Sequence, residues 1–536
     1  MYIEELPGPQ QIAGAGTSTT VFVGWTERGP LETPTQIDSW NAFTRTFGNF
    51  VWGRNTAYAV YNFFAEGGAL AYVVRAAPNP PTSETTAVLE LGNLAISASS
   101  PGAWGNLLGV LIENWPTETP PASTATPIFV LRVVYPQPTG TPSLMDQLVA
   151  RFAEINQLPV VNANGANYWV VEQFPGLTAN DLTKPDANSA APIETRINAQ
   201  SLFIRVAVNE PGPGTRPENV LTPAMLQGGA GDPSTTPVDY ASALATLDPL
   251  NDISLLVLPD TAMIEDLGKQ RATVQEAISY CEGRTPRDLF VIADAPFGLD
   301  VQDVVSFKSG AASPDSVVPA GNALNSSYGA LYYPWIDFFN GLTSVNIPTP
   351  PSGAIAGTYA ETDNRVGVFK APAGITDGKL SSAVGLSNLV TSSDQDVLNP
   401  NGINALRMLP RYGIVTYGAR TLSTDPSLTY VNVRRLLTYI EMSLYWGLQW
   451  VVFEPNDQKL WGAVNRDVTQ FLTSVWQAGG LFGAQESEAF FVQVNAANNP
   501  PETRNQGLLF VDVGVAPVRP AEFVVIRIQQ ATLPTG

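Results

Sequence analysis

The sequence predicts a protein of several domains, of the α/β and α+β classes. Residues 20–76 and 237–395 alternate strand-like and helix-like apolar patterns, which is typical of sheets covered by helices. Residues 77–226 combine strand-like runs with four Pro-rich segments, which indicates an inserted, β-rich domain. With 536 residues, the chain is also longer than one hydrophobic core usually holds.

The first alternating stretch contains two strands and two helices. Residues 20–25 (TVFVGW) predict a strand. Apolar residues at helical spacing follow, which predicts a helix that Ser39 is placed to cap. A second helix is expected over residues 55–66 and a second strand over residues 69–75. This order predicts a layered sheet.

The second alternating stretch predicts a parallel sheet. Residues 253–258 (ISLLVL) form a continuous apolar run, as expected of a buried parallel strand. A helix over about residues 268–282 and a strand over residues 288–293 follow, so we expect a βαβ unit.

The C-terminal region shows the most regular helical pattern. Its apolar positions recur at helical spacing and stop before two glycines, which predicts a helix over about residues 464–478. A strand is expected before this helix, over residues 448–456, and three strands after it, over residues 490–496, 507–515 and 522–528. The region therefore predicts a compact α+β domain.

Composition shifts and Pro-rich stretches set the expected domain boundaries. We expect an N-terminal arm (1–18), the first part of an α/β domain (19–89), an inserted peripheral β-rich domain (90–225), the second part of the α/β domain (226–400), a C-terminal α+β domain (401–519) and a C-terminal arm (520–536).

The charge and residue content exclude several classes of function. The net charge of −20 repels phosphate backbones and argues against nucleic-acid binding. The first ten residues are neither basic nor apolar enough for a signal peptide, so we expect a protein made in the cytoplasm. No run of about 18 apolar residues exists, so we expect no membrane span.

The sequence offers little catalytic chemistry. It contains no histidine, which removes the commonest general base and metal ligand. The single cysteine, Cys281, lies in an apolar helical pattern and is interpreted as a buried structural thiol. Asp294 ends a predicted strand and is interpreted as a cap or turn residue, and a Ser352–Lys370 dyad is a remote alternative. The glycine cluster at residues 228–231 lacks a phosphate-binding pattern. We therefore predict no catalytic, cofactor-binding or metal-binding residues.

Several stretches together resemble the contractile tail sheath family. They include YIEELPGPQQIAGAGTSTTVFVGWTERGP at the start, FFAEGGALAYVVR, YCEGRTPRDLFVIADAP, PPSGAIAGTYAETDNRVGVFKAPAG, and YVNVRRLLTYIEMSLYWGLQWVVFEPND near the end. Each stretch alone is loose, but their number and order span the chain, most weakly between about residues 115 and 225. Ala354 stands where the family often has histidine.

The resemblance implies a structural protein and not an enzyme. Members of this family have a subtilisin-like α/β domain and a separate domain that carries both chain termini. They assemble as stacked hexameric rings around an inner tube, held between a baseplate and a terminal cap, and they contract to drive the tube through a target envelope. The resemblance thus implies a subunit of a phage tail or phage tail-like particle, assembled in the bacterial cytoplasm, without a cofactor.

Two sets of residues are expected to make the contacts between subunits and with the tube. Strand-forming segments at both ends suit strand addition to a neighbouring subunit, and they comprise Tyr2, Ile3, Glu4, Glu5, Leu6, Glu522, Phe523, Val524, Val525, Ile526 and Arg527. The polar face of the helix over 464–478 is expected to face the tube, through Asn465, Arg466, Asp467, Thr469, Gln470, Thr473 and Gln477. Gly14 and Gly16 are expected to let the N-terminal arm flex.

Two other classes of protein stay open. A hydrolase on the subtilisin-like scaffold is disfavoured by the absence of histidine, and a peptidase assay distinguishes it. A surface adhesin would suit the Pro/Thr-rich insertions but would need a secretion signal. The sequence does not distinguish a phage from a bacteriocin or another injection system.

Overall fold

The computed structural model describes residues 11–76, 85–115, 128–231, 238–315 and 317–522. The chain divides into two compact units. The larger unit comprises residues 16–365 and 372–429, and the described part of the smaller unit comprises residues 11–15, 366–371 and 430–522. The C-terminal part of the smaller unit thus begins at Tyr430 and not at residue 401 as expected from the sequence, because the strands just after residue 401 pair with the sheet of the larger unit.

The larger unit is built on an eight-stranded sheet. Its six central strands are parallel, and each edge strand is antiparallel to its neighbour. In spatial order the strands are β19 (Gly413–Thr416), β18 (Ile403–Leu409), β14 (Gly329–Tyr333), β13 (Phe290–Asp294), β12 (Leu255–Val257), β1 (Thr20–Gly24), β3 (Ala71–Arg75) and β2 (Thr35–Ile37). The predicted multidomain α/β architecture is confirmed.

Helices cover both faces of this sheet, because its strands are apolar on both sides. On β1, Val21 faces the core that includes residues of α5 and α6, whereas the ring of the neighbouring Phe22 packs against Phe63 of α2 at 5.5 Å. The helices of this unit are α1 (Trp40–Phe47), α2 (Thr56–Ala65), α5 (Tyr240–Ala245), α6 (Leu267–Gly283), α7 (Val301–Ser309), α8 (Ser352–Arg365), α9 (Gly374–Asp377) and α10 (Ser392–Leu398), with the 3₁₀ turn η3 (Pro259–Met263). Ser39 caps α1 as predicted, since its side chain accepts a hydrogen bond from the Ala42 amide.

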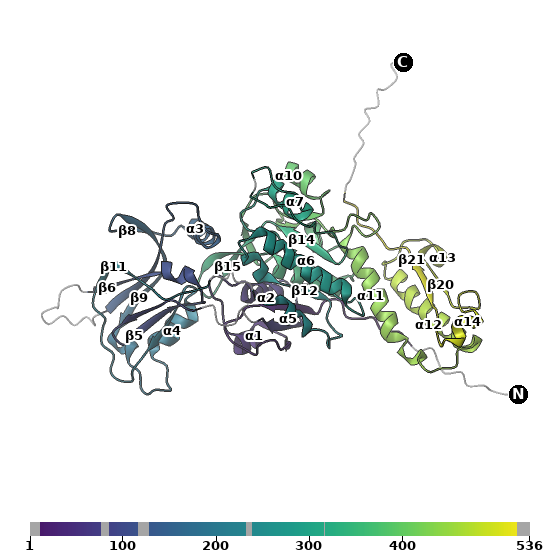
Figure 1. The fold of residues 1–536 in the computed structure, drawn as a ribbon, viewed down its shortest axis with the longest axis horizontal. Coiled ribbons are helices and arrows are strands. Elements are labelled where there is room, and N and C mark those ends of the chain that lie inside the picture. The colour runs from purple at the N-terminus through teal and green to yellow at the C-terminus, as the bar shows by residue number, and fades with distance from the viewer. Residues whose placement is uncertain (1–10, 77–84, 116–127, 232–237, 316, 523–536) are drawn as a thin grey trace, which may run out of the picture. The chain divides into compact units, whose positions relative to one another are not determined.

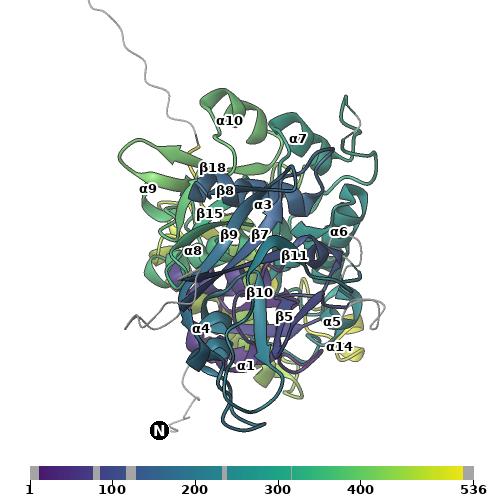
Figure 2. The same cartoon turned by 90° about the vertical axis from the view of Figure 1, so that its left-hand side faces the viewer.

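Three smaller antiparallel sheets complete the larger unit. The first contains, in spatial order, β10 (Ile204–Val208), β5 (Leu94–Ala98) and β4 (Val88–Leu91). The second contains β11 (Val220–Met225), β6 (Gly109–Trp115), β7 (Ile128–Pro136), β9 (Ala166–Thr178) and β8 (Val160–Ala163). The third contains β16 (Val345–Thr349), β15 (Ile336–Asn340) and β17 (Ala383–Leu386). Figure 2 looks onto the first two sheets. Helix α4 (Pro192–Gln200) packs against β10, and α3 (Leu144–Asn156) packs against β16 of the third sheet. The 3₁₀ turn η1 (Ala103–Leu107) follows β5, and η2 (Ala179–Leu182) follows β9. The β-rich character expected of this region is therefore present.

A buried carboxylate joins two of these sheets. Glu172 of β9 accepts hydrogen bonds from the Ser201 hydroxyl and the Leu202 amide, both at 2.5 Å, just before β10 begins. Burial raises the pKa of Glu172 to about 7, against the opposing effect of these hydrogen bonds and of nearby Arg205. Arg205 in turn contacts Glu27 at 3.2 Å and the Phe50 carbonyl at 2.9 Å, so the inserted strands are tied to the main sheet's loops.

The smaller unit is a helix pair with a two-stranded sheet (Figure 1). Its elements are α11 (Val431–Gly447), the 3₁₀ turn η4 (Gln449–Val451), α12 (Gln458–Gln477), α13 (Glu486–Ala489), β20 (Phe490–Gln493), α14 (Pro501–Asn505) and β21 (Asp512–Val515). The predicted helix is present but begins earlier, because the Asp457 side chain accepts hydrogen bonds from the Lys459 and Leu460 amides and caps it. It ends, as predicted, just before Gly479, whose φ is +92°.

The strand predicted over residues 448–456 is wrong. The segment forms η4 and tight turns, with the Leu448 amide bonded back to the Leu444 carbonyl and the Glu454 amide to the Val451 carbonyl. Short apolar runs suit a strand or a helix end equally well, and this one continues from α11. The strand predicted over residues 522–528 lies outside the described residues except for Glu522.

Candidate assembly site

The core of the smaller unit forms between the two long helices. Val464, Val468, Leu472 and Val475 of α12 are buried against Leu436 and Ile440 of α11. The apolar stripe predicted on α12 is therefore the buried face of the helix. The two-stranded sheet packs on the same helix through Phe490.

The sheet formed by β20 and β21 has one face inside and one outside. Phe490 and Val492 pair with Val515 and Val513 and point to the core, while Phe491 pairs with Gly514 on the outer face. Both valines of β21 stay half-exposed, although they pack against the core. Within the described part of the chain the sheet contains two strands, which is marginal for independent stability.

The described ends of the chain both belong to this unit. Ile12 is 7% exposed and lies in the same core as Leu436 and Ile440. At the other end, the Tyr430 hydroxyl donates a hydrogen bond to Glu522 at 3.3 Å. The predicted arm residues Tyr2–Leu6 and 523–527 lie outside the described residues.

The polar residues predicted on the exposed side of α12 divide into two groups. Arg466, Gln470 and Gln477 are exposed, and Asn465, Thr469 and Thr473 are half-buried. Asn465 also donates a hydrogen bond to the Val492 carbonyl at 3.3 Å, which ties α12 to β20.

Asp467 corrects the expectation for this face, because it is buried. Position 467 follows Val464 by three residues and precedes Phe471 by four, so it lies on the buried stripe of the helix. Its carboxylate contacts the Arg466 guanidinium at 3.2 Å. Asp467 therefore cannot present its side chain directly to a partner.

Three exposed aromatic side chains of this unit were not predicted from the sequence. Phe453 is fully exposed with a φ of +75°, Phe482 is 74% exposed, and Phe491 is exposed on β20. A ring of Phe491 lies over Gly514, where a Cβ atom would be 2.1 Å from it.

The region around Asp294 has the geometry of a structural cap. At the carboxyl end of β13, Asp294 accepts hydrogen bonds from the Ser352 amide at 2.8 Å and the Ser352 hydroxyl at 2.5 Å, at the start of α8. Burial raises the pKa of Asp294 to about 7, opposed by these bonds. Ser352 thus donates its proton to a carboxylate and has no histidine to activate it. Ser352 and Lys370 belong to different units.

Other chemically notable groups are few. Cys281 is fully buried in α6, and burial raises the pKa of its thiol. Across the described residues there is no group of three or more Asp, Glu or Cys side chains placed to hold a metal ion, and no helix among them is long and apolar enough to cross a membrane.

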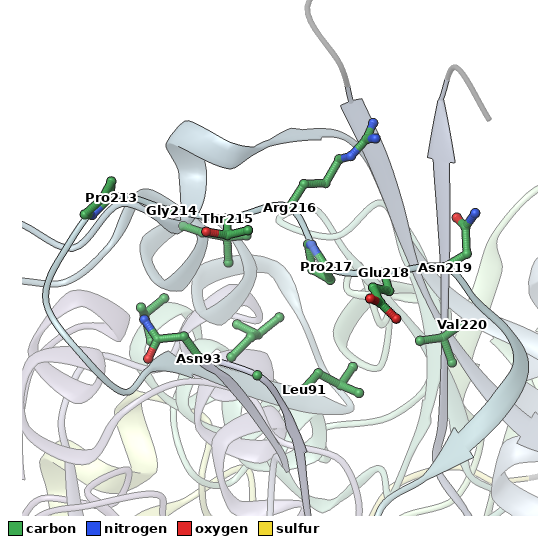
Figure 3. A pocket seen from close by; sticks show the side chains of 14 residues that line it. Leu91, Asn93, Pro213, Gly214, Thr215, Arg216, Pro217, Glu218, Asn219 and Val220 are labelled. Carbon is green, nitrogen blue, oxygen red and sulfur yellow. The ribbon is translucent and has the colours of Figure 1, made fainter. Parts of the chain in front are cut away.

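A cavity of about 520 Å³ lies in the inserted region, between the β4–β5 turn and the loop before β11 (Figure 3). Two of its polar side chains are engaged with the chain itself. Asn93 exchanges hydrogen bonds with the Glu210 backbone at 2.9 and 2.7 Å, and Arg216 points away from the cavity toward the Ile128 carbonyl. The lining combines apolar side chains such as Leu91 with polar ones such as Thr215 and Glu218, and it shows no built site for a particular ligand.

Comparison with solved structures places the fold among contractile sheath proteins. The chain matches the sheath of PVC, an extracellular contractile injection system, in its contracted state with a TM-score of 0.56, 20% identity, and coverage of 99% of this chain and 97% of that chain. It matches the contracted helical sheath of the anti-feeding prophage (AFP) with a TM-score of 0.53, 22% identity, and coverage of 99% and 98%.

Sequence comparison agrees with the fold. Residues 423–531 match the family model described as the phage tail sheath C-terminal domain. The tail sheath protein of Vibrio phage KVP40 is 23% identical over 68% of this chain and 55% of that protein, and the tail sheath protein of Enterobacteria phage T4 is 22% identical over 47% and 37%. The chain thus spans about half or less of the length of these curated relatives. The resemblance to the contractile tail sheath family inferred from the sequence is confirmed.

Proposed function

We propose that this chain is the structural subunit of a contractile sheath. It polymerises as stacked hexameric rings around an inner tube and contracts to drive the tube through a target envelope. The observation that carries the proposal is the agreement over 99% of the chain with sheaths in the contracted state. A metastable array needs only a few kcal/mol of better packing per subunit to contract, so an enzymatic activity is not required.

The smaller unit would join neighbouring subunits by strand addition. The segments at residues 2–6 and 522–527 would add strands to the β20–β21 sheet of other copies, with backbone hydrogen bonds supplying the affinity. Three features support this: both described chain ends belong to the unit, the sheet has two strands within the described residues, and its inward valines are half-exposed. Added strands would cover those valines and complete the core.

The outer side of α12 would contact the inner tube. Asn465, Arg466, Thr469, Gln470, Thr473 and Gln477 stay candidates for this surface, and buried Asp467 would act through Arg466. A polar surface suits a contact that must hold before contraction and release afterwards, because single exposed ion pairs contribute about 0–1 kcal/mol. Six-fold repetition would multiply such weak contacts.

The remaining partners follow from the same role. A sheath needs a baseplate to trigger it and a terminal cap to end it, and one of the matched structures is an AFP baseplate, at a TM-score of 0.52. Assembly would take place in the bacterial cytoplasm, and the β-rich region of residues 90–225 would lie at the periphery of the particle. No cofactor is required.

A hydrolase is the second candidate, because a serine and a carboxylate meet at the end of β13. Burial disfavours it, since Ser352 is 0% and Asp294 1% exposed, and no histidine is present in the chain to act as the usual base. A peptidase assay with a general protein substrate tests this alternative directly.

Electron microscopy of the purified full-length protein tests the proposed function. Tubes or six-fold rings at raised concentration are the expected result. Particles that stay monodisperse and monomeric at high concentration, with and without an inner-tube protein, would overturn it.

A further inference from the structure

Residues 12–15 pack along one face of helix α11. The Ala15 amide donates a hydrogen bond to the Ser443 hydroxyl at 2.9 Å, and Gly14 lies so close to Tyr439 that a Cβ atom there would be 2.3 Å from the Tyr439 hydroxyl oxygen. Ile12 packs against Gly447, where a Cβ atom would be 2.6 Å from Ile12 Cγ2.

The three helix positions share one face of α11. Tyr439, Ser443 and Gly447 follow one another at intervals of four residues, so they form a continuous line, which we call the arm seat. Gly447 makes room for the branched side chain of Ile12, and Ser443 supplies the acceptor for a backbone amide that would otherwise lack one. Gly14 thus serves a close approach rather than the flexing expected from the sequence.

We propose that the arm seat fixes the point at which the N-terminal arm leaves its own subunit to reach a second copy of this chain. This inference rests on the proposed sheath function. With residues 12–15 held, the tether between the seat and the strand proposed at residues 2–6 is residues 7–11, which would span at most about 17–18 Å. Without the seat, the tether would run from residue 7 to β1, which begins at Thr20, and would be at least twice as long.

The length of the tether governs how well the arm binds. The effective concentration of a tethered segment falls roughly as the −3/2 power of tether length, so doubling the tether lowers it about threefold. A seated arm also leaves from a fixed direction, which limits the neighbouring sites that it can reach. The seat therefore favours one neighbour over others in the array.

Two matched pairs of glycine variants of the full-length protein test the proposal. Gly447→Ala places a methyl group against Ile12, whereas Gly462→Ala on α12 has no atom within 4 Å of the added Cβ. Both changes replace a helical glycine by a better helix former, so neither is expected to unfold its helix. Gly14→Val and Gly16→Val form the second pair, because a Cβ atom at Gly16 likewise meets nothing within 4 Å.

Two measurements are made on each variant. Hydrogen exchange of the Ala15 amide in the monomer reports on the seat, and the critical concentration for tube formation by sedimentation reports on assembly. In Gly447→Ala and Gly14→Val, Ala15 should exchange about tenfold faster or more and the critical concentration should rise about threefold or more. Gly462→Ala and Gly16→Val should match the unmodified protein in both.

The outcomes separate this inference from the proposed function. Unchanged Ala15 exchange in Gly447→Ala and Gly14→Val overturns the seat itself, and this arm of the test needs no polymer. Faster exchange with an unchanged critical concentration overturns its role in assembly. Failure of the unmodified protein to form tubes would instead contradict the sheath function.

Discussion

The Oδ1 atom of Asp467 accepts a hydrogen bond at 3.2 Å from Nε of the preceding residue, Arg466. The Asp467 side chain is 1% exposed and lies inside the smaller unit, whereas the Arg466 side chain is 47% exposed. Its second oxygen, Oδ2, is buried and has no hydrogen-bond partner in the described part of the chain. A buried carboxylate thus holds an exposed guanidinium at the surface of α12. Fixing the Arg466 side chain in this way reduces the entropy that it would lose on contact with a partner.

The two members of this pair should have opposite effects on stability. Asp467→Asn removes a poorly compensated buried charge and should raise the free energy of unfolding by about 1 kcal/mol. Arg466→Ala leaves that charge unpaired and should lower it by about 1 kcal/mol or more. Hydrogen exchange of the α12 amides in the monomer, at increasing urea, measures both. A loss of stability in Asp467→Asn would show that the carboxylate is better satisfied than its hydrogen bonds indicate.

Charge reversal at Arg466 should weaken the proposed contact with the tube. Arg466→Glu places two carboxylates side by side, so the arginine's contribution is lost at an exposed position without a change in the apolar stripe. Co-sedimentation with an inner-tube protein at moderate salt should fall, while sheath–sheath polymerisation stays intact. Lys459→Glu, in the first turn of the same helix, is the control and should bind as before. Equal binding by Arg466→Glu and the control would place the tube contact elsewhere.

Local patterns in the sequence predicted α12 well, but not which of its polar residues are buried. Polarity alone placed Asp467 outside, although its position, three residues after Val464 and four before Phe471, places it on the apolar stripe. The helical angle was available from the sequence, so this error was avoidable.

Contacts between distant residues could not be predicted in the same way. Ile12 lies in the core of α11 and α12, more than 400 residues along the chain, and the hydrogen bond from Ala15 to Ser443 is equally remote. A short apolar segment next to glycines looks the same whether it is free or docked. The segment at residues 448–456 failed for a related reason, because Trp450 and Val451 reach the core from a helix end and not from a strand.

The stability of the larger unit should fall as the pH rises from about 4.5 to 7. Burial raises the pKa of Glu172 from 4.5 to about 7, so the folded state binds a proton more tightly than the unfolded state. The stabilising effect of that proton is fully present below the unfolded pKa and is lost as the pH rises through the folded pKa. The loss is on the order of 3 kcal/mol for this group.

A single substitution isolates this effect. Glu172→Gln keeps the shape of the side chain and an acceptor for the Leu202 amide, so it should flatten the pH dependence between about 4.5 and 7. Urea-induced unfolding at several pH values compares it with the unmodified protein. The difference between the two proteins should grow toward pH 7 in favour of the variant; a constant difference would contradict the raised pKa.

The Ser352 hydroxyl should matter for stability and not for catalysis. Ser352→Ala removes one of the two hydrogen bonds that Asp294 accepts and leaves the Ser352 amide bond in place. Loss of a hydrogen bond to a buried carboxylate should lower the free energy of unfolding by about 1–3 kcal/mol. Tube formation at a temperature well below unfolding should be unchanged. Peptidase activity in the unmodified protein that disappears in this variant would favour the hydrolase.

Two truncations should separate the segment proposed to exchange between subunits from the docked residues 12–15. Removal of residues 1–10 deletes the predicted strand at residues 2–6 but retains Ile12, so the monomer should keep its stability while forming no long tubes. Removal of residues 1–14 also deletes Ile12, whose burial contributes about 1.5–3 kcal/mol, and should destabilise the smaller unit by about that amount. Hydrogen exchange in α11 measures the stability, and electron microscopy with sedimentation measures assembly. Long tubes formed after removal of residues 1–10 would show that these residues do not link subunits. Equal protection of the α11 amides from exchange in the two truncations would show that Ile12 adds little to the stability of the core.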